Sequence, residues 1–151
     1  MKTIHGDLLK LALDGEFDVI IHGCNCYGAM GAGIAKAIKS LFPEAYDADR
    51  KTPKGDRTKL GKISFATVDR DGRQITIVNG YTQFHWRGSN GLADYSAIRS
   101  VMAAVKQHFR GRRIGYPKIG AGLAKGDWNL ISQIIHQELD GEDHTFVEFA
   151  S

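Results

Sequence analysis

The chain has 151 residues, of which 42% are apolar and 25% are charged, and its net charge is +3. This composition is typical of a folded domain, and we expect one domain over residues 1–151 with a sizeable core. The small net charge does not by itself indicate a nucleic-acid-binding protein, and no apolar run reaches the roughly 20 residues that span a bilayer.

The two cysteines, Cys24 and Cys26, lie two residues apart on a predicted strand, where a mutual disulfide is geometrically implausible. We therefore expect reduced thiols, which are typical of a reducing compartment. The first ten residues, MKTIHGDLLK, contain no apolar core of signal-peptide length. Together these features predict a cytoplasmic protein.

The first half of the chain predicts two strands and two helices. Val19-Ile20-Ile21 is the apolar centre of a buried strand, and Pro43 closes the second helix. In order, we expect a strand at residues 2–5, a short helix at 8–13, a strand at 18–23, a helix at 33–41 and an exposed charged loop at 50–59.

The second half predicts a hairpin and then alternating helices and strands. Arg70-Asp71-Gly72 is a strong hairpin signal, and apolar residues recur with helical spacing from Tyr95 to Phe109. In order, we expect strands at 63–68 and 74–79, an aromatic and glycine-rich loop at 81–91, a helix at 92–109, a strand at 113–116, a glycine-rich loop at 117–126, a helix at 128–139 and a strand at 144–149.

This alternation predicts an α/β protein with a mixed sheet and helices on both faces. Ligands of such sheets bind beyond the carboxyl ends of the strands. The two glycine-rich loops and residues 79–83 all follow predicted strands, so we expect them to meet at that edge.

The stretch FDVIIHGCNCYGAMGAGIA, residues 17–35, joins a buried strand to a helix through a glycine-rich loop. Backbone N–H groups and the helix dipole can hold a phosphate there, and glycines let the backbone approach it. The spacing fits neither the Rossmann pattern, because Lys36 stands at its third position, nor a Walker loop. The alternative is a tight turn without a ligand. Two such loops at one sheet edge favour phosphate binding.

Gly6-Asp7-Leu8, CNCYGAMGAGIA and IGAGLAKGDW occur in the order found in macrodomains, and the chain resembles that family over nearly its whole length. The resemblance implies a three-layer α/β/α fold around a mixed six- or seven-stranded sheet. It also implies an ADP-ribose cleft that needs no metal or redox cofactor. HGCNC, YTQ and Gly-Asp-Trp are most similar to stand-alone ADP-ribose-1″-phosphate phosphatases and terminal ADP-ribose-protein glycohydrolases.

The resemblance assigns parts of the ligand to particular residues. The Asp7 carboxylate would accept from the adenine amino group, although it could also cap a helix. Asn25 would lie at the distal ribose, although it could also stabilise a turn. The predicted ADP-ribose-binding residues are Asp7, Leu8, Gly23, Asn25, Gly31, Ala32, Gly33, Ile34, Thr82, Gln83, Ile119, Gly120, Ala121, Gly122, Leu123 and Ala124.

His22, Asn25 and Asp127 are the predicted catalytic residues. His22 matches the histidine proposed to act on the terminal phosphate in similar phosphatases, as nucleophile or general acid, while the other two orient ribose and water. The alternatives are a core histidine for His22 and a helix N-cap for Asp127. Cys24 and Cys26 could join His22 as metal ligands, but no fourth ligand is evident, so we expect no metal.

The loop after the hairpin supplies aromatic residues. Phe84, His85, Trp86 and Tyr95 could form a wall near the ribose or adenine, although Tyr95 also fits simple core packing.

The chain departs from the glycohydrolase branch at two places. The catalytic Lys and loop Asp of that branch correspond to Gly80-Tyr81 and Ala124, which argues against its chemistry.

We therefore expect a hydrolase of ADP-ribose derivatives, first of all an ADP-ribose-1″-phosphate phosphatase. Its partners would be ADP-ribose, its 1″-phosphate or ADP-ribosylated macromolecules, and not a membrane. The alternatives are an ADP-ribose reader without turnover, an ADP-ribosyl glycohydrolase, and a nucleic-acid-associated protein that uses residues 50–59 and 110–113. Such basic runs are more often solvated surface, so we do not expect a nucleic acid partner.

Overall fold

The computed structural model describes residues 2–88 and 92–149. Its strands are β1 (Lys2–Gly6), β2 (Val19–Asn25), β3 (Ile63–Arg70), β4 (Arg73–Gln83), β5 (Ile114–Tyr116) and β6 (His144–Phe149). Its helices are α1 (Leu8–Leu13), α2 (Gly33–Leu41), α3 (Pro43–Arg50), α4 (Tyr95–His108) and α5 (Trp128–Glu138), with a 3₁₀ turn, η1, at Arg57–Lys59.

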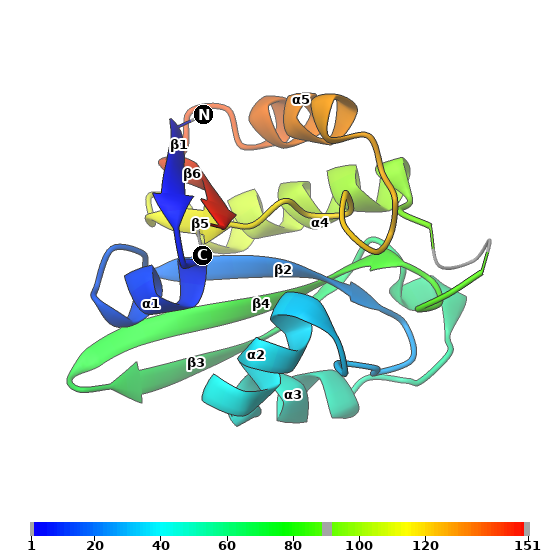
Figure 1. Cartoon of the computed structure of the whole chain (residues 1–151), viewed down its shortest axis with the longest axis horizontal. Coiled ribbons are helices and arrows are strands. Elements are labelled where there is room, and N and C mark those ends of the chain that lie inside the picture. The colour runs from blue at the N-terminus through cyan, green and yellow to red at the C-terminus, as the bar shows by residue number, and fades with distance from the viewer. Residues whose placement is uncertain (1, 89–91, 150–151) are drawn as a thin grey trace.

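Within the described residues, six strands form one sheet in the order β1-β6-β5-β2-β4-β3. All neighbouring pairs are parallel except the β3–β4 hairpin. The mixed sheet with helices on both faces confirms the predicted α/β class (Figure 1).

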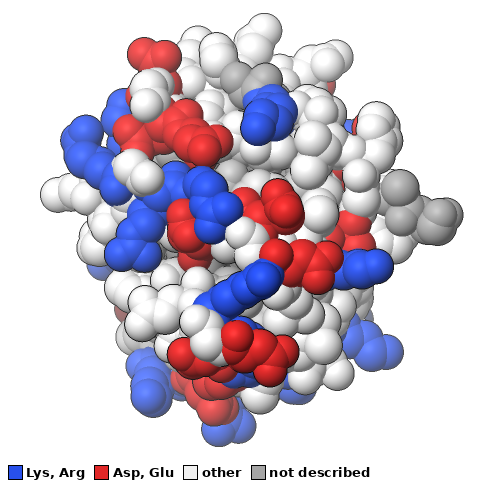
Figure 2. Space-filling view, turned by 90° about the vertical axis from the view of Figure 1, so that its left-hand side faces the viewer, with Lys and Arg blue, Asp and Glu red and all other residues white. Residues whose placement is uncertain are grey.

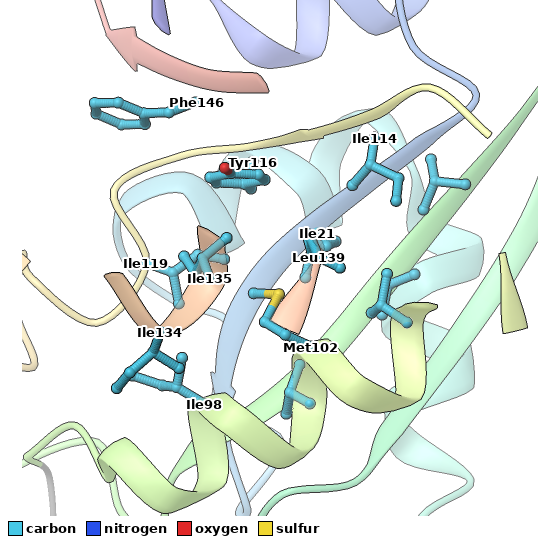
Figure 3. Packing of buried hydrophobic residues seen from close by; sticks show 14 of the residues in the cluster. Ile21, Ile98, Met102, Ile114, Tyr116, Ile119, Ile134, Ile135, Leu139 and Phe146 are labelled. Carbon is cyan, nitrogen blue, oxygen red and sulfur yellow. The ribbon is translucent and has the colours of Figure 1, made fainter. Parts of the chain in front are cut away.

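Side chains on the two faces of the sheet enter two separate cores. Val19 and Ile21 of β2 pack with α4 and α5, whereas Ile20 packs with α1, α2 and α3, because successive strand residues point to opposite faces. Figure 3 shows the first core, in which Ile98 and Met102 of α4 face the sheet. This alternation decides which face each residue of β2 can reach.

The hairpin confirms the predicted turn. Asp71 and Gly72 have φ of 56° and 80°, the left-handed conformation that a two-residue hairpin turn requires. Both hairpin strands are longer than predicted, and β4 continues to Gln83 because β2 pairs with it along its length. Residues 81–83 therefore belong to a strand rather than to the predicted loop, and residues 89–91 of that loop lie outside the described residues.

The structure differs from the sequence-based expectations in three other places. Pro43 begins α3 rather than only ending α2, because proline is well suited to the first helical position. The predicted exposed loop at 50–59 contains η1, and Lys59 is buried. Helix α4 begins at Tyr95, since the Asp94 side chain accepts a hydrogen bond from the Ala97 N–H and caps it.

In the described part of the chain, we find no helix that is long and apolar enough to cross a membrane.

Candidate functional site

The order of the strands across the sheet changes direction between β2 and β5, and the carboxyl ends of these two strands form the switch point. The two strands are parallel neighbours, and each continues into a glycine-rich loop and then a helix. Helix α2, after β2, packs on one face, and α5, after β5, packs on the other. The two loops lie at the same end of the sheet (Figure 1). Parallel sheets bind ligands in the crevice at such a switch point.

The first glycine-rich loop ends in an uncapped helix N-terminus. Ala32 is the N-cap residue of α2 and provides no side-chain hydrogen bond to the first turn. Gly33 has a φ of 58°, and a Cβ at Gly31 or Gly33 would meet no heavy atom within 4 Å. The free N–H groups of this turn therefore face open space that can hold an anion.

The side chain of Asn25 shapes the first loop. Its Oδ1 accepts hydrogen bonds from the backbone N–H groups of Tyr27 (2.9 Å) and Ala29 (3.2 Å), and its Nδ2 donates to the Ala29 carbonyl (2.9 Å). The residue is 7% exposed. Asn25 thus acts as the turn asparagine that we considered as its alternative, at the end of β2 beside the crevice.

The second loop, residues 117–126, folds back on itself. The Gly126 N–H donates to the Gly120 carbonyl at 2.6 Å, and a Cβ on Gly126 would lie 2.5 Å from that oxygen. Ile119 and Ala124 are buried, whereas Leu123 is 77% exposed. A Cβ at Gly122 would meet nothing within 4 Å, so the tip of the loop is open to a ligand.

Asp7 and Asp127 are both helix N-caps. Asp7 Oδ1 accepts from the N–H groups of Leu9 and Lys10, and Asp127 Oδ1 accepts from the Asn129 N–H. Each carboxylate therefore uses one oxygen in the cap. The backbone N–H of Asp127 also donates to the Tyr95 hydroxyl at 3.1 Å, and the half-buried Tyr95 ring is not part of the core.

Thr82 lies against Gly23 at the base of the crevice. A Cβ on Gly23 would lie only 2.7 Å from Thr82 Oγ1 and 3.3 Å from Ile119 Cγ2. The Thr82 hydroxyl is buried and finds no hydrogen-bond partner among the described residues. Gly23 is required here because any side chain would displace Thr82. Gln83, next along β4, donates from Nε2 to the His85 carbonyl.

His22 lies on the face of the sheet opposite to its neighbour Gly23, because successive strand residues point to opposite faces. It is completely buried, and its Nε2 lies 2.7 Å from Asn79 Oδ1. Asn79 Nδ2 donates to the Ala45 carbonyl and to Ser64 Oγ, which leaves Oδ1 to accept, so His22 Nε2 carries the proton. Burial lowers the pKa of His22 and is opposed by the hydrogen bond to Asn79. These contacts correspond to the core histidine that we considered as its alternative.

The burial of His22 argues against a direct action of its ring on a terminal phosphate, because no surface of the imidazole is accessible in this structure. Its neighbours Cys24 and Cys26 are free, buried thiols whose pKa is raised by burial. Among the described residues, no three His, Cys, Asp or Glu side chains are placed to hold a metal ion.

The sequence did not indicate a buried polar cluster beneath the first loop. The Tyr81 hydroxyl donates to Asp49 Oδ1 at 2.7 Å and lies 2.8 Å from Ser64 Oγ, and burial raises the Tyr81 pKa. Lys59 Nζ donates to the Cys26 carbonyl. Asp49 Oδ2, which has no partner in the described part of the structure, lies 3.6 Å from where a Gly28 Cβ would stand. The sequence could have indicated this cluster only through Asp49, which lies on the inward side of α3. That indication depends on recognising α3, which was not predicted from the sequence.

A surface hollow lies at the opposite end of the sheet from the glycine-rich loops, where β2, β4 and β5 begin. It encloses about 500 Å³ between Asp14, Asp18, Arg73 and Arg112, among others, and Arg113 forms an ion pair with Asp18 at 2.9 Å. Figure 2 shows this side of the molecule, with acidic and basic side chains intermingled. The second basic run, residues 110–113, therefore lies far from the glycine-rich loops.

With this fold and these loops, the chain belongs to the Macro domain family, whose model matches residues 21–135. It is 36% identical to an uncharacterised 17.5 kDa protein of Enterobacteria phage T4, over 89% of this chain and 87% of that protein.

Two groups of relatives carry names that describe an activity. The chain is 28% identical to a DNA ADP-ribosyl glycohydrolase of Mycobacterium tuberculosis over 85% of its length, and it spans 35% of that longer protein. It is 51% identical to an ADP-ribose 1″-phosphate phosphatase of Aspergillus oryzae, over 47 residues that make up 31% of this chain and 22% of that protein.

Solved structures support the fold. The macrodomain of Mycobacterium tuberculosis DarG superimposes with a TM-score of 0.77 at 22% identity, over 99% of this chain and 97% of that one. Thermosipho africanus DarTG in complex with ADP-ribose gives a TM-score of 0.75 at 18% identity, over 99% of this chain and 42% of that one.

Proposed function

We propose that this protein binds ADP-ribose in the crevice between the ends of β2 and β5 and hydrolyses a bond at the distal ribose. The observation that carries the proposal is the pair of glycine-rich loops that follow two adjacent parallel strands and lead to helices on opposite faces. Backbone N–H groups on both sides of a crevice can hold a diphosphate without a metal ion. The names of the two groups of relatives support this choice of ligand.

In this proposal the adenine end lies at Asp7 and the diphosphate lies between the loops. Asp7 uses Oδ1 to cap α1, so Oδ2 is available to accept from the adenine amino group. The open positions at Gly31, Gly33 and Gly122 give the phosphate oxygens room to approach the backbone.

Asn25 and Asp127 are the proposed residues at the distal ribose. Asn25 keeps the first loop in shape, and the free oxygen of Asp127 would polarise the attacking water. Main-chain N–H groups would stabilise the negative charge that develops in the reaction. His22 is given no direct part in this chemistry, because its side chain is completely buried.

The first candidate substrate is ADP-ribose 1″-phosphate, which the 51% identity to the Aspergillus phosphatase favours. The second is ADP-ribosylated DNA, which is favoured by the much longer match to the glycohydrolase. This second reaction would depend on another set of residues, because Gly80-Tyr81 and Ala124 stand where the glycohydrolase branch has its catalytic Lys and loop Asp. Measuring phosphate and ADP-ribose release from both substrates decides between the two reactions.

The central test uses Gly122→Glu, whose side chain would bring bulk and negative charge into the diphosphate position. Gly122 has no positive φ and no near neighbour, so the variant should fold. Ala103→Glu on the exposed face of α4 is the matched control. We expect ADP-ribose binding by calorimetry to be lost in Gly122→Glu alone. Equal affinity in both variants would contradict the proposed site.

Asp127→Asn tests the proposed role in catalysis. Asparagine is as good an N-cap as aspartate, so α5 should be preserved. We expect turnover to fall by roughly 10²- to 10⁴-fold, the range for loss of an acid–base group, with ADP-ribose affinity little changed. A protein that binds ADP-ribose but releases no product from any substrate would instead be a reader.

A further inference from the structure

Four aromatic rings gather beside the first glycine-rich loop, from two segments far apart in the sequence. His85 and Trp86, just after β4, stack with ring centroids 3.8 Å apart and an interplanar angle of 22°. Tyr27 meets Phe84, His85 and Trp86 edge-on at centroid distances of 5.2, 4.9 and 5.7 Å. Trp86 is 46% exposed. We call these four residues the aromatic platform.

The first basic run folds against this platform. The Gly55 N–H donates to the Cys26 carbonyl at 2.7 Å, and the Cys26 N–H donates to the Phe84 carbonyl at 2.9 Å. These main-chain bonds connect the segment before η1 to the loop after β2 and to the end of β4. A Cβ on Gly55 would lie 3.1 Å from the Tyr27 ring, so the segment is in close contact with the platform.

Exposed cations surround the rings as a result. The Arg57 guanidinium lies 3.9 Å from the Phe84 ring centroid, and that of Arg87 lies 5.7 Å from the Trp86 centroid. Lys54 is also exposed on the same segment. The nearby Asp56 carboxylate is engaged by the N–H and hydroxyl of Thr58. An exposed ring such as Trp86, backed by further aromatic rings and with arginines beside it, is the chemistry that binds unpaired bases and their phosphates.

The platform is connected to the proposed catalytic end of the crevice. Asn25 Oδ1 accepts the hydrogen bond from the Tyr27 N–H, so the residue that we place at the distal ribose also positions a ring of the platform. A group attached to the distal ribose would emerge next to these rings. The small net charge did not by itself indicate nucleic acid, but net charge averages over the whole surface and does not register a local arrangement.

We propose that the aromatic platform, with Arg57, Arg87 and Lys54, binds single-stranded nucleic acid, so that the ADP-ribosyl group processed by this site is one carried on such a strand. This inference rests on the proposed function for the position of the ribose. A single strand is required because the bases of a duplex are stacked on each other and their faces are not accessible to the platform.

The test measures fluorescence anisotropy of a labelled single strand of about 12 nucleotides, within the usual range of site sizes, with the matching duplex alongside it. The variants are Trp86→Ala and the double variant Arg57→Gln/Arg87→Gln. Arg110→Gln/Arg112→Gln is the control, because it removes the same charge at the opposite edge of the sheet. Inorganic polyphosphate serves as a competitor that has charge but no bases.

We expect the single strand to bind more tightly than the duplex and Trp86→Ala to weaken single-strand binding by about 5- to 150-fold, the effect of losing one stacked base. The Arg57→Gln/Arg87→Gln variant should reduce the slope of log affinity against log salt by about 1.4, or roughly 0.7 for each contact, and the control should not. Absence of binding at low salt, equal loss in the control, or equally effective competition by polyphosphate would overturn the proposal.

ADP-ribose calorimetry on the same variants separates this inference from the proposed function. If Trp86→Ala binds ADP-ribose normally but has lost the strand, both hold. If wild type binds ADP-ribose but no strand, the platform proposal fails alone. If it binds the strand but no ADP-ribose, the proposed function fails, and with it the assignment of the strand as substrate.

Discussion

The Nε2 of His22 lies 2.7 Å from the Oδ1 of Asn79, and both side chains are completely buried on the face of the sheet that packs against α2 and α3. Asn79 in turn donates to the Ala45 carbonyl of α3 and to Ser64 of β3. This chain of hydrogen bonds connects β2 and β4 to the helical layer and to the edge strand. It favours a structural role for His22, the alternative that we considered from the sequence.

His22→Ala should therefore lower stability more than it lowers ligand binding. The substitution leaves a cavity and an unpaired acceptor on Asn79, at a cost of about 2–4 kcal/mol in the free energy of unfolding. Urea unfolding measures this cost, and calorimetry below the unfolding transition should give an ADP-ribose affinity within about threefold of wild type. The exposed His5→Ala is the control. Full stability with lost turnover would restore a catalytic role for His22.

Asn25→Ala should loosen the first glycine-rich loop. It removes three hydrogen bonds, and we expect a loss of about 1–3 kcal/mol in stability together with weaker ADP-ribose binding. Asn25→Asp keeps the acceptor for the Tyr27 and Ala29 N–H groups and should be milder. Hydrogen exchange at these two amides reports on the loop directly. Unchanged protection in Asn25→Ala would show that the loop is held by other contacts.

Substitutions at Gly23 and Thr82 should have strongly non-additive effects on the free energy of unfolding. Gly23→Ala forces a methyl group to 2.7 Å from Thr82 Oγ1 and should cost about 1–3 kcal/mol, the usual range for overpacking. Thr82→Ala removes a hydroxyl that has no partner in the described structure, so it should cost less, and it should relieve part of the strain in the double variant. A double-mutant cycle by chemical unfolding measures the coupling, and strict additivity would contradict this close contact.

Stability should fall as the pH decreases from about 6.5 to about 4. Burial lowers the pKa of His144 to about 4 from its ordinary value of 6.5, and its Nδ1 lies 2.7 Å from the Tyr116 hydroxyl. Between these values the unfolded chain binds a proton that the native state does not, so the stabilising contribution is fully present above pH 6.5 and is lost below it. Burial of His22 acts in the same direction.

The pH dependence is checked by unfolding His144→Gln at a series of pH values. Part of the decline between pH 6.5 and 4 should disappear in this variant. His5→Gln, at an exposed position, should retain the whole decline. Identical pH profiles for His144→Gln and wild type would contradict the assignment.

The sequence by itself determined the class of fold, because local patterns were sufficient. The period of the apolar residues predicted α2 at its observed bounds and β6 at its own, and Asp71-Gly72 specified the hairpin turn. The glycine-rich loops were also visible as motifs, since glycine positions depend on backbone conformation. Residues 43–50 were missed as a helix because Pro43 was interpreted only as a terminator.

Only the tertiary structure decided which residues meet. The pattern of the strand allows His22 to face either layer of helices, and packing places it on the side of α3, where it bonds to Asn79. The meeting of Arg57 with Phe84, and of Tyr27 with Trp86, depends on how three strand ends converge. No local pattern encodes such contacts, because they join segments that are separated along the chain and are brought together by burial of the two cores on either side of the sheet.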